Sequence, residues 1–228
     1  MNNLFWKKYG CVAGLVLVLL FIPVIASYGA EKETGKTKPL VRIAIIPFQT
    51  ILPKLEAGNT AICPLCGAVY FGGKIAKGGE KVTEELFIEK LKNFKEVEII
   101  PQEKVEGIYK RVRAESLKMP LMEVLKKTGA ESGADLIAVG YVFRYRERIG
   151  YNYSVEKPAS VAFEISFVDP QNGDIIWRGV FDKTQKSLME DVFQIASFFE
   201  GGGKWLTARE LTKQGMDHAF KTFSGFEH

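Results

Sequence analysis

The stretch that decides the fold runs from Leu136-Ile-Ala-Val-Gly-Tyr-Val-Phe-Arg-Tyr-Arg146 through Val161-Ala-Phe-Glu-Ile-Ser-Phe-Val-Asp169 to Ile175-Ile-Trp-Arg-Gly-Val-Phe-Asp182. In the middle segment, apolar residues alternate with Ala, Glu and Ser, which is the period of a strand with one buried face. The connecting turn contains Asn172-Gly173, a pair typical of β-hairpins. We therefore expect an antiparallel hairpin of long strands at the centre of the fold.

Upstream segments predict parallel β-α-β units that lead into this hairpin. A strand at Val41–Phe48 is apolar on nearly every residue, so we expect it to be central in the sheet. The expected order is then a helix at Glu80–Phe94, a strand at Val97–Ile100, and helices at Glu103–Val112 and Leu121–Thr128. Gly129 is expected to be the C-cap of the helix at Leu121–Thr128. Such an order predicts an α/β fold with a three-layer-like mixed sheet of about five strands and covering helices.

The C-terminal part, residues 187–224, is predicted to be helical. Ser187-Leu-Met-Glu190 and Thr207-Ala-Arg-Glu210 both have the spacing of a reciprocal capping box at a helix start. Each precedes a run of apolar residues at helical spacing, and we expect these runs to pack against the domain.

The N-terminus has the pattern of a secretory signal. Lys7 and Lys8 precede an uncharged, mainly apolar run over Tyr9–Ala30 that ends in small residues, and cleavage after Gly29 fits best. Cys11 precedes the apolar centre of the run, so lipidation is not expected. We predict a signal peptide at 1–29, a flexible leader at 30–40 and one α/β domain at 41–228. The protein is then exported to the periplasm or the periphery of the outer membrane, with an uncleaved membrane anchor as the alternative.

Composition and charge restrict the class of partner. The 228 residues have a formal charge of +4, which loss of Lys7 and Lys8 would lower by two. Lysines elsewhere are interleaved with glutamates, as on a solvated face, so nucleic acid is not an expected partner.

Gln49–Gly79 is predicted to be one long loop, and any binding site specific to this protein is expected there. The loop contains Cys63-Pro-Leu-Cys66-Gly67. The favoured interpretation is a structural disulfide between Cys63 and Cys66, because an exported protein meets oxidising conditions. Zinc binding is an alternative, although a closed zinc site needs four ligands; His218 with a carboxylate, or the thiols of two chains, would complete it. A redox couple is the third interpretation.

We find no catalytic set in the sequence. A Ser-His-Asp triad would have to use His218, and the sequence contains no nucleophile elbow. The glycine-rich segment after Gly67 lacks the residues of a phosphate-binding loop. The sequence therefore indicates a protein that is not an enzyme and needs no cofactor, with zinc at Cys63 and Cys66 left open.

Three segments resemble a known group of envelope proteins: Val41–Phe48, Gly133–Gly140 and Phe167–Trp177. They are similar to the curli-secretion channel lipoproteins and to the N-terminal α/β domain of the Tol-system propeller protein. The resemblance implies an envelope-side α/β domain that binds other proteins. The chain departs from the group in having no lipid-carrying cysteine after its apolar run and no pair of channel strands, so no functional residue carries over.

These observations together predict a secreted, non-catalytic cell-envelope protein that acts in assembly, secretion or scaffolding through protein–protein contacts. The expected partners are envelope or outer-membrane proteins, and homo-oligomers and peripheral membrane association remain open. The alternative is a thiol–disulfide or metal-binding protein that acts through Cys63 and Cys66.

Overall fold

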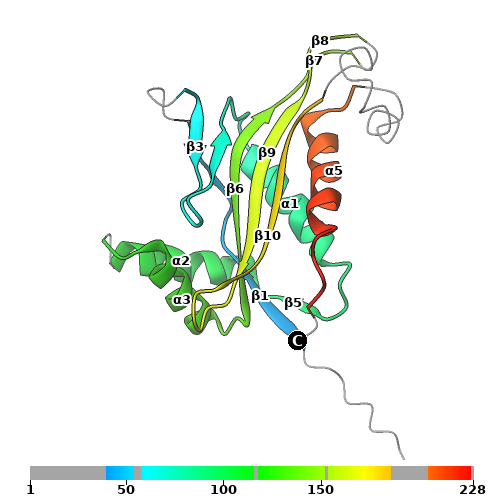
Figure 1. The fold of residues 1–228 in the computed structure, drawn as a ribbon. Coiled ribbons are helices and arrows are strands. Elements are labelled where there is room, and N and C mark those ends of the chain that lie inside the picture. Colours follow the sequence, from blue (N-terminus) through cyan, green and yellow to red (C-terminus); the bar gives the residue numbers. More distant parts are fainter. Residues whose placement is uncertain (1–39, 54–57, 116–117, 152–153, 186–204, 227–228) are drawn as a thin grey trace, which may run out of the picture. The chain divides into compact units, whose positions relative to one another are not determined.

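A mixed sheet runs through the middle of the domain in the computed structural model (Figure 1). The structure describes residues 40–53, 58–115, 118–151, 154–185 and 205–226. Within them the main sheet has the order β10-β9-β6-β1-β5, and the short strand β2 (Gln49–Thr50) pairs with β6 outside this order. The predicted α/β class and the sheet of about five strands are confirmed.

The parallel half of the sheet is built on β1 (Val41–Ile45), which lies between β5 (Val97–Ile99) and β6 (Leu136–Arg146). Ile43 pairs with Ile99 on one side and Leu136 on the other, and both pairings are parallel. Ile43, Ala44 and Ile45 are buried, as expected for a strand covered on both faces. The predicted central position of this first strand is confirmed.

The antiparallel half is formed by β6, β9 (Ser160–Val168) and β10 (Ile175–Thr184). The predicted hairpin between β9 and β10 is confirmed, and its turn uses Gly173 at a φ of 87°. The expectation that β9 buries only one face was wrong, because every residue of β9 is buried. Strand β9 lies inside the sheet, and both of its faces are covered by other elements.

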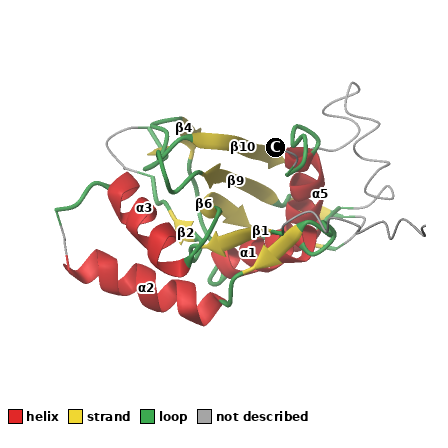
Figure 2. Ribbon diagram, turned by 90° about the horizontal axis from the view of Figure 1, so that it is seen from below, coloured by secondary structure: helices red, strands yellow, loops and turns green. Residues whose placement is uncertain are grey.

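Helices cover the two faces of the sheet (Figures 1 and 2). Helices α1 (Gly79–Leu91) and α5 (Ala208–Phe220) pack in a first core on one face, with the apolar side chains of β9 and β10 such as Phe163 and Phe167. Helices α2 (Gln102–Glu115) and α3 (Leu121–Ser132) pack in a second core on the opposite face. The layered arrangement predicted from the sequence is thus confirmed.

The segment Gln49–Gly79 differs most from its prediction. Instead of one long loop, it contains β2 and a separate hairpin of β3 (Thr60–Ile62) and β4 (Val69–Phe71). Each of these strands has only two or three residues, which is too short for a periodic signal. Ala61 and Tyr70 of the hairpin join the second core, so the hairpin covers part of the sheet beside α2 and α3.

Two smaller predictions are also corrected. Helix α3 continues through Gly129 and ends at Gly133, whose φ of 76° suits the left-handed C-cap. Gly129 instead allows a close approach, because a Cβ there would lie 2.3 Å from Pro170. The connection Ile149–Pro158 contains a small hairpin of β7 (Ile149–Gly150) and β8 (Val155–Lys157) rather than only a loop.

The capping box at the start of α5 is confirmed, since the Thr207 side chain accepts from the Glu210 amide and the Glu210 carboxylate accepts from the Thr207 amide. The apolar face of helix α5 packs against the domain, as predicted. The box at Ser187–Glu190 and the signal segment lie outside the described residues. No helix in the described ranges is long and apolar enough to cross a membrane.

Two glycines inside helices should respond to alanine in opposite directions. A Cβ at Gly215 of α5 would lie 2.4 Å from the packed ring of Phe181, whereas a Cβ at exposed Gly107 of α2 has nothing within 4 Å. Overpacking of about 1–3 kcal/mol outweighs the helix-propensity gain of about 1 kcal/mol at Gly215. In chemical denaturation we expect Gly215→Ala to lower the free energy of unfolding and Gly107→Ala to raise it. Equal effects of the two changes would contradict this packing of α5 on β10.

Candidate functional site

The β3–β4 hairpin has one buried and one exposed face. Its register places Ala61 opposite Tyr70 on the inner face and Ile62 opposite Val69 on the outer face. The inner pair is buried, while Ile62 and Val69 are exposed, together with Phe71. The hairpin therefore lies flat on the sheet and directs apolar side chains outward.

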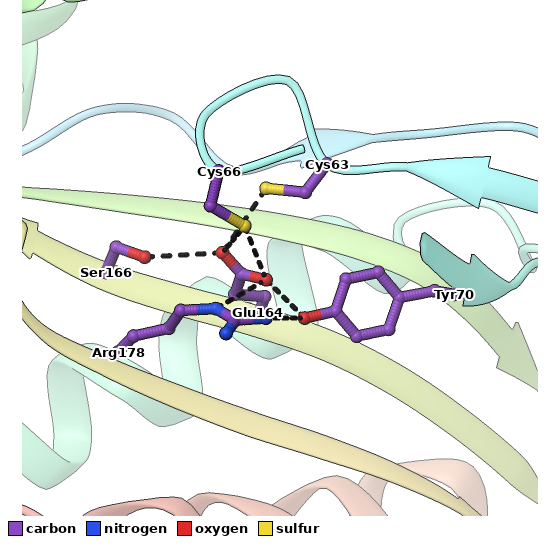
Figure 3. A network of polar contacts seen from close by, with 6 residues as sticks. All are labelled: Cys63, Cys66, Tyr70, Glu164, Ser166 and Arg178. Carbon is purple, nitrogen blue, oxygen red and sulfur yellow. Dashed lines mark hydrogen bonds and ion pairs between the residues drawn. The ribbon is translucent and has the colours of Figure 1, made fainter. Parts of the chain in front are cut away.

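The turn of this hairpin is a compact loop that carries both cysteines. The Cys63 amide donates to the Ala68 carbonyl at 2.8 Å, and the Gly67 amide donates to the Cys63 carbonyl at 3.0 Å. Gly67 has a φ of 73°, a conformation that favours glycine. The amides of Leu65 and Cys66 both hydrogen-bond the Cys63 thiol. These bonds fix the two sulfur atoms on the side of the turn that faces the sheet (Figure 3).

Glu164 of β9 lies beneath this turn and is fully buried. The Cys63 and Cys66 thiols each donate to the same oxygen, Oε1, with a sulfur–oxygen distance of 3.2 Å (Figure 3). The other oxygen, Oε2, accepts from the Tyr70 hydroxyl and lies 3.0 Å from Arg178 Nε. One carboxylate thus joins β9 to the hairpin on one side and to β10 on the other.

The arrangement keeps Glu164 ionised. Burial alone would raise the pKa of Glu164, but the hydrogen bonds from Tyr70, Cys66 and Cys63 and the charge of Arg178 lower it below its ordinary value. Arg178 also donates to the Tyr70 hydroxyl at 2.6 Å. The pKa of Tyr70 is raised by burial and by its bond to Glu164, so the hydroxyl remains a donor.

The same surroundings keep Cys63 protonated. Burial raises the pKa of the Cys63 thiol to about 12, although the two amide hydrogen bonds of the turn act against this rise. A redox couple requires a thiolate of lowered pKa, often at the N-terminus of a helix, and the turn of a hairpin offers neither feature. The geometry therefore does not favour thiol–disulfide exchange.

The structure brings together some of the residues predicted for the site and separates others. Cys63 and Cys66 lie side by side as free thiols, so the disulfide favoured from the sequence is absent from this structure and stays a prediction. His218 lies on α5, and its ring centroid is 6.2 Å from that of Phe181. Phe181 belongs to the core on the face of the sheet opposite the β3–β4 hairpin. His218 therefore does not complete a metal site with the two cysteines.

Sequence reasoning missed Glu164, Tyr70 and Arg178. Glu164 was assigned to the solvent face of β9, because it alternates with apolar residues. The available signal was a glutamate in the middle of a strand whose neighbours on both sides are long and apolar. Such a strand is central in a sheet, and a charge in its middle needs partners from whatever covers it.

A hollow lies at the carboxyl end of β1, with a cavity volume of about 460 Å³. Glu84 is one of the acids that line it; burial raises the pKa of Glu84, and its carboxylate accepts from the Phe48 amide at 2.7 Å and from Gln102. In the described part of the chain, the residues lining this hollow include no histidine, cysteine or serine. The polar side chains of its lining are several glutamates with Lys81 and Gln102.

Comparisons with known proteins give a likeness of fold only. No protein-family model and no curated protein matches the chain. Among solved structures, it is similar to the PelC dodecamer of Paraburkholderia phytofirmans, at 11% identity and a TM-score of 0.44, with 79% of this chain and 85% of that chain covered.

Two further solved structures are similar to the chain. Lipoprotein GNA1162 of Neisseria meningitidis has 14% identity and a TM-score of 0.41, over 72% of this chain and 99% of that one. The LpoB C-terminal domain of Salmonella enterica has 11% identity and a TM-score of 0.35, over 66% of this chain and 87% of that one. None of the three is named as a curli-secretion or Tol-system protein, so the narrower resemblance is not confirmed.

Removing the Tyr70 hydroxyl should lower the free energy of unfolding more than removing a hydroxyl that bonds a neutral group. Tyr70→Phe deprives Glu164 of a donor but keeps the ring that stacks on Phe143 at 4.1 Å. Because hydrogen bonds to charged groups contribute about 1.5–3 kcal/mol, we expect a loss in that range when unfolding is measured by denaturant with a chelator present.

The matched control is Tyr109→Phe, because the Tyr109 hydroxyl accepts from the neutral Gln49 amide group, at 2.9 Å. That change should cost about 1 kcal/mol or less, as for a neutral hydrogen bond. If the two variants were equally stable, the Tyr70–Glu164 bond would contribute nothing beyond an ordinary contact.

Proposed function

We propose that this chain is an exported, non-catalytic component of a bacterial-type cell envelope. It acts in assembly, secretion or scaffolding, and it does so by binding another protein on the outer face of the β3–β4 hairpin. The proposal combines the secretory pattern of the N-terminus with the surface properties of this hairpin.

The observation that carries the proposal is the apolar outer face of the hairpin. Phe71 is 71% exposed, Val69 is 64% exposed and Ile62 is 53% exposed, and all three project from the same side of two paired strands. Soluble proteins rarely expose apolar side chains in contiguous groups unless the group contacts a partner, and aromatic residues are enriched in protein interfaces.

The outer face is held in a fixed position, as a protein-binding surface requires. Its inner side is bonded to Glu164 through Cys63 and Tyr70, and Arg144 of β6 donates to the Phe71 carbonyl at 2.6 Å. A surface that is ordered before binding loses less entropy when a partner docks. The contact can therefore be specific although it uses few side chains.

A protein partner fits this face better than an anionic lipid surface. The two strands read Thr-Ala-Ile and Val-Tyr-Phe, and neither contains the lysine or arginine that membrane-surface binding favours. The catalytic alternative is weakened by the protonated state of Cys63, because the thiolate is the reactive form.

Site-specific photo-cross-linking in intact cell envelopes tests this proposal. A photoreactive phenylalanine analogue is placed at Phe71 or at Val69, and at Glu98 of β5 as an exposed control position away from the hairpin. We expect positions 71 and 69 to give the same discrete protein adduct, identified by mass spectrometry, and position 98 to give none of it.

A further variant ties the adduct to the apolar face. Val69→Ser should reduce the adduct formed from position 71, because it removes a neighbouring apolar contact without touching the cross-linker. A second copy of this chain in the adduct would identify the partner as the protein itself. Adducts with lipid alone, or the same adducts from all three positions, would contradict a protein contact on this face.

A further inference from the structure

We infer that the Cys63 and Cys66 thiolates and the Glu164 carboxylate form a binding site for a divalent zinc ion, which fastens the β3–β4 hairpin to the central sheet. The inference goes beyond the proposed function, because it rests on the inner side of the hairpin and does not depend on any partner. It also differs from the disulfide that the sequence favours, since a metal requires both sulfurs in the reduced state.

The positions of the three ligand atoms carry the inference. The two sulfurs and a carboxylate oxygen all lie within 4.8 Å of one another, and each sulfur is 3.2 Å from Oε1 of Glu164. In a tetrahedral zinc site, with Zn–S of about 2.3 Å and Zn–O of about 2.0 Å, a sulfur and an oxygen ligand lie roughly 3.5 Å apart. The observed spacing is therefore close to that of ligands around one ion.

The turn provides the local structure that thiolate ligands need. The sequence Cys63-Pro-Leu-Cys66-Gly67 is the form of a zinc knuckle, in which two cysteines approach a metal from one tight turn. The amides of Leu65 and Cys66 already hydrogen-bond the Cys63 sulfur, and such bonds favour its charged form. The chain would therefore change little when the protons of the thiols are replaced by a cation.

The two oxygens of Glu164 differ in their nearest partners, as expected for a metal ligand with outer-shell support. Oε2 is held by Tyr70 and by Arg178, whereas both thiols lie 3.2 Å from Oε1, and Cys66 is farther from Oε2, at 3.5 Å. Bonds to the distal oxygen orient a ligating carboxylate and are a regular part of metal sites. Oε1 is then the oxygen that would bind the ion.

The charges balance when a divalent cation is bound. Two thiolates and one carboxylate carry three negative charges, and the cation together with Arg178 carries three positive charges. A buried cluster of this kind is tolerated when its charges compensate one another. Binding is an exchange in which one aqueous divalent ion enters and the two thiols release one proton each, with no change in oxidation state.

The ligand types select the metal. Thiolates are soft ligands that favour zinc over magnesium and calcium, which prefer oxygen. In the part of the chain that the structure describes, the cluster contains three residues of the ligating types, so water is the natural fourth ligand. Cys66 is exposed, which gives both the ion and this water a path to the site.

Metal titration of the full-length chain tests the inference. The protein is reduced, freed of metal with a chelator, and titrated with Zn²⁺ alone or with Co²⁺ alone as a spectroscopic substitute. We expect one ion per chain by elemental analysis, and Co²⁺ should produce the sulfur-to-metal charge-transfer absorption of thiolate ligands. Absence of stoichiometric binding to reduced, folded wild-type protein would overturn the inference.

Variants test each ligand separately, with circular dichroism as the check that they fold. Cys66→Ser and Glu164→Gln should each weaken Zn²⁺ binding at least about 100-fold, because even outer-shell partners contribute about 10–100-fold. Val69→Ser is the control on the same hairpin, since its exposed side chain lies on the outer face, away from the three ligands, and its affinity should stay within a few-fold of the wild type.

Two further outcomes are decisive. Wild-type affinity in Glu164→Gln would remove the carboxylate from the site and overturn the inference as stated. A chain isolated with a Cys63–Cys66 disulfide that still fails to bind Zn²⁺ after reduction would do the same. The cross-linking experiment on the outer face uses no metal, so failure of either proposal can be told from failure of the other.

Discussion

A carboxylate buried in the middle of a central strand is the constraint on which this structure depends. Glu164 is ionised and fully buried, and an unpaired charge in such a place would be strongly destabilising. Its partners come from three places: Arg178 on β10, Tyr70 on β4 and the two cysteines of the hairpin turn. Because a hydrogen bond to a charged group contributes about 1.5–3 kcal/mol, the bonds that the hairpin donates to Glu164 couple the hairpin to the sheet energetically.

The topology explains why a separate hairpin is needed at this position. Helices α2 and α3 cover the sheet beside β1 and β6, and the β3–β4 hairpin covers the same face further along β6 (Figures 1 and 2). The opposite face has no such division, since α1 and α5 form a continuous aromatic core with Phe167 and Trp177. Among the described residues, the polar cluster around Glu164 therefore lies where a hairpin covers the sheet, and the outer side of that hairpin is apolar and exposed.

Local patterns predicted the frame of the fold but not the site. The central strand β1, the β9–β10 hairpin and the Thr207 capping box each arise from neighbouring residues, so a short window of sequence contains the information. The contact of Cys63 with Glu164 joins residues 101 positions apart, and no local period reports it. Alternation in β9 predicts that only one face is buried. The sequence does not show that a hairpin from far upstream, with strands of three residues each, covers the other face.

Amide hydrogen exchange of residues 60–71 tests most directly the claim that Glu164 holds the hairpin on the sheet. In the metal-free wild type, the amides bonded within the hairpin and its turn should exchange slowly, because opening them exposes the buried carboxylate. In Glu164→Gln these amides should exchange much faster, while those of β6 and β9 remain protected. Unchanged protection of residues 60–71 in this variant, with the sheet intact, would contradict the account.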